Sequence, residues 1–141
     1  MTVSLIISIY NSPDFLERVL ASVYRLTSLP FEVLIAEDGN FTANHGVISQ
    51  WQKKWPKHSK LIHITQRDDG NRKPLAMNKA VAQSLGDYLI FIDGDCVLRC
   101  DFVSEHLKFA SINSFLTGRR VELSPKATKF LTLEKRGREK K

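Results

Sequence analysis

Four short apolar runs, separated by segments of helical periodicity, are the feature that most limits how this chain of 141 residues can fold. The runs cover residues 3–10, 31–36, 60–65 and 86–92, and β-branched residues are common in them. Near-continuous runs of this kind are typical of parallel strands that are buried on both faces. The alternation therefore predicts one α/β domain over residues 1–141, with a mostly parallel central sheet and right-handed crossovers.

The segments between the runs carry helix signals. Ser12 and Pro13 fit the N-cap and first position of a helix, and Pro74 fits the start of a later one. Gly86 is expected to stop that later helix. The residues expected to form the apolar sides of the first three helices are Phe15, Leu16, Val19, Leu20 and Val23; Val47, Ile48, Trp51 and Trp55; and Leu75, Met77, Ala80, Val81 and Leu85.

The last third of the chain carries weaker signals. Asp101 is expected to cap a helix that contains Phe102, Val103, Leu107 and Phe109. Residues 114–121 are expected to form a further strand, and a last helix is expected from Lys126 onward.

The net charge of +6 favours partners that carry phosphate or other anionic groups. Much of the excess lies in a basic cluster near the C-terminus, which we interpret as a solvated helix or terminus, with attraction to a membrane surface as the weaker alternative. Its members are Lys126, Lys129, Lys135, Arg136, Arg138, Lys140 and Lys141. No apolar run is long enough to cross a bilayer and no signal peptide precedes the first run, so we expect a cytoplasmic location, with peripheral contact at the inner face of the membrane as an extension.

The spacing of cysteines and histidines predicts no metal site of their own. Cys96 and Cys100 suggest neither a disulfide framework nor a zinc site. The histidines lack metal-ligand spacing, and surface or packing roles are expected for all of them: His45, His58, His63 and His106.

Asp93, Gly94 and Asp95 follow directly after the fourth apolar run. Side chains two residues apart in an extended chain point to the same side, so the two carboxylates would form an oxygen pocket. Such a pocket suits a divalent cation that phosphates also hold, and Gly94 would let a diphosphate approach the backbone. Asp-Gly is also a common turn signal, so the motif alone fits a plain turn equally well.

Other polar residues are expected at the same edge of the sheet. Tyr10 and Asn11 follow the first run, Asp38 follows the second, and the loop of residues 66–73 follows the third. Ligands bind at the carboxyl ends of the strands in open α/β sheets. The convergence favours a binding site over a plain turn at Asp93.

With these residues in place, the chain resembles a family 2 glycosyltransferase of the GT-A fold, a Rossmann-like three-layer α/β domain. The matching stretches cover nearly the whole chain: residues 3–13, 31–40, 68–80 and 86–95. Residues 93–96 and 118–121 resemble the subgroup that builds bacterial cell-surface polysaccharides. The resemblance implies metal-assisted transfer of a sugar, with inversion, from a nucleotide diphosphate donor, usually a UDP-sugar, to a hydroxyl of a glycan or lipid-linked acceptor. The implied cofactor is Mg²⁺ or Mn²⁺.

The resemblance also implies roles for single residues. It makes Asp95 the direct metal ligand and Asp93 a support of the metal shell and the ribose. It makes Asp38 the acceptor of a hydrogen bond from the uracil ring, which would discriminate between bases. The other residues that it places against the nucleotide sugar are Tyr10, Asn11, Arg72, Lys73 and Asn78.

Simpler roles stay open for several of these residues. Asp38 also fits a turn before Gly39, and residues 72–73 also fit a solvated loop. Whether Glu37 touches the base is open, because the family often has Asp there. Arg119 and Arg120 fit either an acceptor or phosphate contact or a charged strand edge.

An inverting transferase also needs a general base, which the family carries beyond the strand that follows the metal motif. Glu122 and Glu134 lack that context, so no catalytic base is assigned. We therefore expect the acceptor portion to be largely absent from this chain. A catalytically incomplete nucleotide-sugar-binding module stays open as an alternative, and self-association through apolar surface is expected. Nucleic-acid binding is not expected, since no recognised motif supports it, and the surrounding chain fits a phosphatase or nucleotidyltransferase less well.

Overall fold

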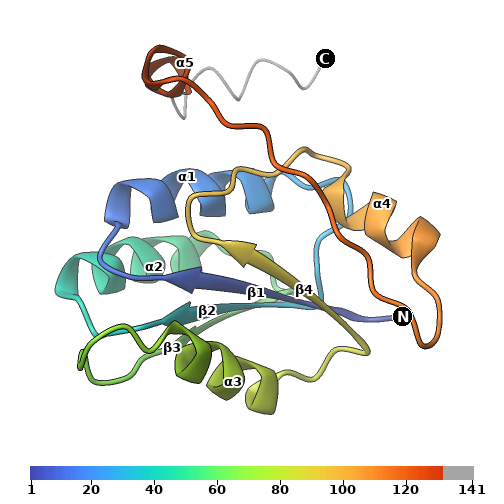
Figure 1. Cartoon of the computed structure of the whole chain (residues 1–141), viewed down its shortest axis with the longest axis horizontal. Helices are drawn as coiled ribbons and strands as arrows, with labels where there is room; N and C mark the ends of the chain where they lie inside the picture. The colour runs from blue at the N-terminus through green and yellow to red at the C-terminus, as the bar shows by residue number, and fades with distance from the viewer. Residues whose placement is uncertain (132–141) are drawn as a thin grey trace.

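The structure of the chain is a computed structural model that describes residues 1–131. The elements follow the order β1 (Val3–Ile9), α1 (Pro13–Tyr24), β2 (Glu32–Glu37), α2 (Thr42–Lys54), β3 (Lys60–Ile64), α3 (Lys73–Gln83), β4 (Tyr88–Asp93), α4 (Phe102–Phe109) and α5 (Pro125–Phe130). The strands form one parallel sheet in the order β3-β2-β1-β4. Helices α1 and α2 cover one face of this sheet and α3 covers the other (Figure 1). The predicted α/β fold with a parallel central sheet is confirmed.

Strand β1 lies at the centre of the fold and is buried along its whole length. Its alternate side chains point to opposite faces of the sheet. Leu5 and Ile7 belong to the larger core, which includes residues of α1 and α2, whereas Ile6 packs with Leu34 and Ala76 on the α3 side. A sheet that is covered on both faces explains why the first run is apolar without alternation.

Helix α1 begins at Pro13, and Ser12 occupies the N-cap position, as the sequence predicts. Its buried side chains match the predicted apolar side, with one exception. Phe15 is 44% exposed and lines a cleft above the sheet. The prediction that Phe15 faces the sheet is therefore wrong, because this residue of the first turn of α1 faces the cleft instead.

Helix α3 packs through small side chains rather than through its large apolar residues. Ala76 and Ala80, four residues apart, are buried against the sheet. The predicted apolar side is therefore confirmed at Ala80. It is wrong at Leu75 and Val81, which are exposed, and at Leu85, which lies beyond the end of α3 and is 68% exposed. Small residues four apart let the helix approach the sheet closely, which large side chains would prevent.

Gly86 does not end α3, because the helix stops at Gln83. A Cβ atom at Gly86 would lie 2.5 Å from Ser4 Oγ and 2.6 Å from Ser4 N. Glycine is therefore required where the chain passes close to β1. The prediction that Gly86 serves to stop the helix is wrong.

Strand β4 is an edge strand of the sheet that residues 1–131 form. Ile90 is buried, but Phe91 is 48% exposed. Within residues 1–131, the prediction that residues 86–92 form a buried strand is therefore wrong on the face that carries Phe91. Residues 114–121, predicted as a strand, have no regular secondary structure and run diagonally past the sheet (Figure 1).

The last described helices begin close to where the sequence predicts. Asp101 occupies the N-cap position of α4, but its side chain accepts no capping hydrogen bond. Helix α5 begins at Pro125, and the Ser124 hydroxyl accepts a hydrogen bond of 3.1 Å from the Ala127 N–H. The basic residues beyond position 131 and Glu134 lie outside the described residues. None of the helices within residues 1–131 has the length and hydrophobicity that crossing a membrane requires.

Candidate functional site

A cleft of about 760 Å³ opens at the carboxyl ends of β1, β2 and β4. Its lining includes five residues predicted from the sequence: Tyr10, Asp38, Lys73, Asp93 and Asp95. Three further predicted residues, Asn11, Arg72 and Asn78, are not part of the lining. The carboxylates of two separate sequence motifs therefore meet in one cleft.

The acidic motif is held in place by β1. Ser8 pairs with Asp93 in the parallel register, and the Ser8 hydroxyl donates a hydrogen bond of 3.2 Å to Asp93 Oδ1. The Gly94 N–H donates to the Ser8 carbonyl over 2.8 Å. A Cβ atom at Gly94 would lie 2.4 Å from Ile9 Cγ2, so the glycine is required by the packing against β1. The turn carrying the aspartates is thereby tied to the central strand.

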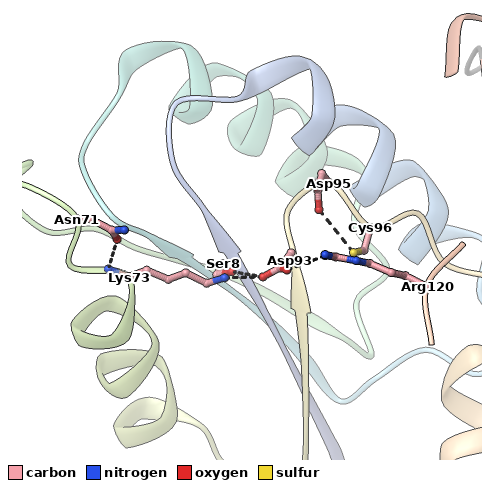
Figure 2. Close-up of polar contacts among 7 residues, drawn as sticks. All are labelled: Ser8, Asn71, Lys73, Asp93, Asp95, Cys96 and Arg120. Atoms are coloured by element: carbon pink, nitrogen blue, oxygen red, sulfur yellow. Dashed lines mark hydrogen bonds and ion pairs between the residues drawn. The ribbon is translucent and has the colours of Figure 1, made fainter. Parts of the chain in front are cut away.

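Two cations contact Asp93 (Figure 2). Lys73 Nζ, at the start of α3, donates to Asp93 Oδ1 over 2.6 Å, and Arg120 Nη1 lies 3.4 Å from Asp93 Oδ2. The hydrogen bond from Lys73 is the largest influence that lowers the pKa of Asp93, and the positive charge of Arg120 adds to it. Asp93 is therefore an ionised carboxylate whose two oxygens both face positive side chains.

The acidic motif also has the donor atoms of a hard cation site. The ligand atoms of Asp93, Asp95 and Cys96 all lie within 4.8 Å of one another. Burial, followed by the negative charge of Asp95, raises the pKa of the Cys96 thiol, so the thiol stays protonated and the carboxylates are the available donors. Carboxylate oxygens suit Mg²⁺ and Mn²⁺, and the residues present fit either ion.

Asp38 is a buried and oriented hydrogen-bond acceptor at the other end of the cleft. Gln66 Nε2 donates to Asp38 Oδ1 over 2.8 Å, and the Arg72 N–H donates to Asp38 Oδ2 over 2.8 Å. Each carboxylate oxygen has a second lone pair, so Asp38 keeps capacity to accept from a ligand. The Arg72 side chain instead donates from Nη2 to the Arg67 carbonyl over 2.9 Å, within its own loop.

Tyr10 presents an exposed aromatic ring to the cleft. Tyr10 is 52% exposed, and its ring meets the Phe41 ring edge-on, with the two ring centroids 5.0 Å apart. The Tyr10 hydroxyl donates to Asp68 Oδ2 over 3.0 Å, and this hydrogen bond is the main reason why the pKa of Tyr10 is raised. Tyr10 therefore links the first strand end to the loop that follows β3.

Glu37 does not line the cleft. Its carboxylate is fully buried and accepts from the Phe41 N–H, from Asn44 Nδ2 and from His63. The sequence left open whether Glu37 touches the base. Its carboxylate is engaged by other protein groups outside the cleft. Asn78 is exposed on α3, and Asn11 is exposed after β1.

Sequence reasoning missed several residues of the cleft. Ser8 carries a signal, because it is a polar residue near the end of an otherwise apolar run. Phe15, Asp68 and Asn71 also line the cleft, but each lies in a helix start or loop whose path depends on tertiary packing.

Comparisons with known proteins agree with this fold. The sequence model of the family described as Glycosyl transferase family 2 matches residues 4–134. The uncharacterized glycosyltransferase alr2836 of Nostoc sp. (strain PCC 7120 / SAG 25.82 / UTEX 2576) is 33% identical over 97 residues, which cover 69% of this chain and 29% of that protein.

Two solved structures share the fold at low identity. The mannosyltransferase PcManGT from Pyrobaculum calidifontis, in complex with GDP-Man and Mn²⁺, has a TM-score of 0.67 at 20% identity and is matched over 76% of this chain and 31% of its own. S. aureus TarS 1-349 in complex with UDP-GlcNAc has a TM-score of 0.62 at 21% identity, over 77% of this chain and 31% of its own. The chain thus spans about a third or less of the length of these proteins.

Proposed function

Because the chain belongs to glycosyl transferase family 2, we propose that its cleft binds a nucleoside-diphosphate sugar, with uridine as the preferred nucleoside, for inverting transfer of the sugar to an acceptor hydroxyl. One observation carries the proposal. Asp38 and the Asp93–Asp95 turn, far apart in the sequence, line one cleft together with Lys73. The cleft therefore offers a base acceptor and a diphosphate site side by side.

The base end of the cleft favours uracil. Uracil has an N3–H that can donate to a carboxylate, whereas cytosine has an acceptor at that position. A buried acceptor discriminates strongly, because a ligand without the matching donor leaves it unpaired. Hydrogen bonds from Gln66 and the Arg72 N–H hold the Asp38 carboxylate in one orientation, and the exposed Tyr10 ring supplies an apolar surface for stacking.

The other end suits the diphosphate. Lys73 and Arg120 offer positive charge to phosphate oxygens, and Asp95 with Asp93 would hold Mg²⁺ or Mn²⁺. Such an ion, when bound, stabilises the negative charge that develops on the leaving diphosphate. The complexes of PcManGT with GDP-Man and Mn²⁺ and of TarS with UDP-GlcNAc support this ligand class.

The transfer step itself requires groups that are not assigned. Glu122 is exposed and is not among the residues that line the cleft, so it is not proposed as the general base. The acceptor is proposed to be a hydroxyl of a glycan or of a lipid-linked acceptor. A cytoplasmic location, peripheral membrane contact and self-association remain predictions. The second candidate function is a module that binds the donor without transferring its sugar, which the unassigned base favours.

Calorimetric titration of UDP, CDP and GDP, with and without Mn²⁺, tests the donor site. The parent should bind UDP most tightly and bind it more tightly with Mn²⁺. Asp95→Ala should abolish the effect of Mn²⁺, whereas the matched control Asp69→Ala, which removes an exposed carboxylate outside the cleft lining, should keep it. Equal binding of all three nucleotides, unaffected by Mn²⁺ or by Asp95→Ala, would overturn the proposal.

A separate assay distinguishes the enzyme from the binding module. The chain is incubated with a UDP-sugar, Mn²⁺ and candidate glycan acceptors, and released UDP is measured. Release that depends on an acceptor supports a transferase. Tight binding of the UDP-sugar without release of UDP supports the binding module.

A further inference from the structure

Outside the nucleotide cleft, the structure brings together a second group of metal-ligating side chains. Glu37 ends β2, His45 lies in α2 and His63 lies in β3. One ligand atom from each residue can be chosen so that all three lie within 4.8 Å of one another. None of the three lines the cleft that holds the acidic motif.

The Glu37 carboxylate is held in a fixed orientation. Its Oε1 accepts from the Phe41 N–H over 2.7 Å and from Asn44 Nδ2 over 3.0 Å. These bonds leave Oε2 to face His63 Nε2 at 2.5 Å. With Oε1 engaged by two N–H donors, Oε2 is the carboxylate oxygen that remains as a donor atom for a metal ion.

His45 and His63 supply the two imidazole rings of the group. Their rings meet edge-on, with centroids 4.5 Å apart and planes inclined by 65°. His45 Nε2 also contacts the side-chain oxygen of Asn40. A ring N–H held by an amide oxygen leaves the opposite nitrogen unprotonated in a neutral histidine, which is the usual second-shell arrangement around a ligating imidazole. His63 is nearly buried, whereas His45 is exposed, so the group opens to solvent on the His45 side.

We propose that Glu37, His45 and His63 form a site for Zn²⁺ or a chemically similar transition-metal ion, separate from the acidic cation site. Two imidazole nitrogens, one carboxylate oxygen and an open position for water are a donor set that Zn²⁺ takes in proteins. Carboxylates alone, as in the Asp93–Asp95 turn, suit harder ions. The two sites therefore differ in the class of metal that they take.

The spacing of the donor atoms is compatible with such an ion. Zn²⁺ bonds of about 2.0–2.1 Å in a tetrahedron place ligand atoms roughly 3.3 Å apart. His63 Nε2 and Glu37 Oε2 are 2.5 Å apart, and one ligand atom from each of the three residues lies within 4.8 Å of the others. The ion would then lie between His63 Nε2 and Glu37 Oε2, with the single ring proton of His63 on Nδ1, since a ligating nitrogen must be unprotonated.

The proposal does not depend on the nucleotide site and is tested without nucleotide. Chain freed of metal by a chelator is titrated with Zn²⁺ against a chromophoric competitor, and separately with Co²⁺ while visible absorption is recorded. We expect one Zn²⁺ per chain with submicromolar affinity and a Co²⁺ spectrum typical of four-coordinate nitrogen and oxygen ligation. Loss of UDP binding in the earlier titration would leave this result unaffected, and the reverse also holds.

Variants locate the site. His45→Ala and His63→Gln should each weaken Zn²⁺ binding by more than the roughly 10- to 100-fold that loss of a second-shell partner costs. Glutamine at position 63 keeps an N–H donor for Glu37, and His45 is exposed, so both variants should fold, which circular dichroism checks. The matched control His58→Ala, an exposed histidine outside the group, and Asp95→Ala should bind Zn²⁺ as the parent does. Unchanged affinity in both ligand variants, loss of binding in Asp95→Ala, or no Zn²⁺ bound at micromolar concentration would each overturn the proposal.

Discussion

Asp38 and Asp95 line the same cleft, although they follow β2 and β4, the strands on opposite sides of β1. The parallel arrangement causes this, because all carboxyl ends of the strands meet at one edge of the sheet. Residues 57 positions apart in the sequence can therefore contact the two ends of one ligand.

Lys73→Met is expected to weaken the binding of UDP about tenfold or more while leaving the binding of uridine nearly unchanged. A charge-assisted hydrogen bond to a phosphate contributes roughly 1.5–3 kcal/mol, and uridine has no phosphate. The matched control Lys79→Met removes a charge from the same helix outside the cleft lining and should change neither affinity. Calorimetry measures both ligands; a parallel loss for UDP and uridine would contradict the assignment of Lys73 to the diphosphate.

Asp38→Asn is expected to lower the ratio of UDP affinity to CDP affinity by about tenfold, since the amide presents a donor as well as an acceptor to the base. The variant should also unfold more readily, by about 1–3 kcal/mol, because a buried acceptor of the Gln66 and Arg72 hydrogen bonds is altered. Urea unfolding and nucleotide titration measure the two effects separately. An unchanged affinity ratio in a folded variant would remove Asp38 from the base site.

Glu37→Gln is expected to flatten the acid side of the stability profile. The pKa of Glu37 is lowered from 4.5 in the folded chain, so its contribution is fully present above pH 4.5 and is lost as the pH falls through the lower folded value. At pH 7 the variant should be less stable by about 1–3 kcal/mol, and the difference from the parent should shrink below pH 4.5. Urea unfolding in the presence of a chelator measures this; a difference that stays constant to pH 3 would contradict the expectation.

Gly94→Ala is expected to destabilise the chain by about 1–3 kcal/mol, as overpacking does. The added Cβ atom would lie 2.4 Å from Ile9 Cγ2 and 2.8 Å from the Ser8 carbonyl oxygen. Gly118→Ala is the matched control, because nothing lies within 4 Å of a Cβ atom there, and it should change stability by less than about 0.5 kcal/mol. Thermal unfolding compares the two; equal stability of both variants would show that the acidic turn can move away from β1.

The strands and helix starts could be predicted from the sequence because their signals are local. A strand buried on both faces is apolar along most of its length, as residues 3–9 are apart from Ser4 and Ser8. Proline marks a helix start where it fits the first turn, as Pro13 does. The meeting of the acidic motifs at one edge also followed from the order of strands and helices alone. These predictions required no knowledge of how the side chains pack.

The failures share a physical reason, which is that burial depends on distant partners. Leu75 and Val81 have helical spacing, but the sheet is met by the small Ala76 and Ala80 instead. Phe91 has the pattern of a central strand, yet β4 has a strand partner on one side among the described residues.

The cluster of Glu37, His45 and His63 could not be predicted for the same reason. No spacing within the sequence indicates a metal site. The three residues meet through the pairing of β2 with β3 and the packing of α2 beside it.

The pairing of β1 with β2 on one side and with β4 on the other has a consequence for how this architecture can diverge. A deletion within residues 3–9 would shift the register on both flanks at once and reverse the direction of every following side chain in the strand. Evolutionary change in ligand preference is therefore expected to accumulate in the loops beyond the strands. A loop at one end of the cleft can change in length while the loops at the other end stay the same.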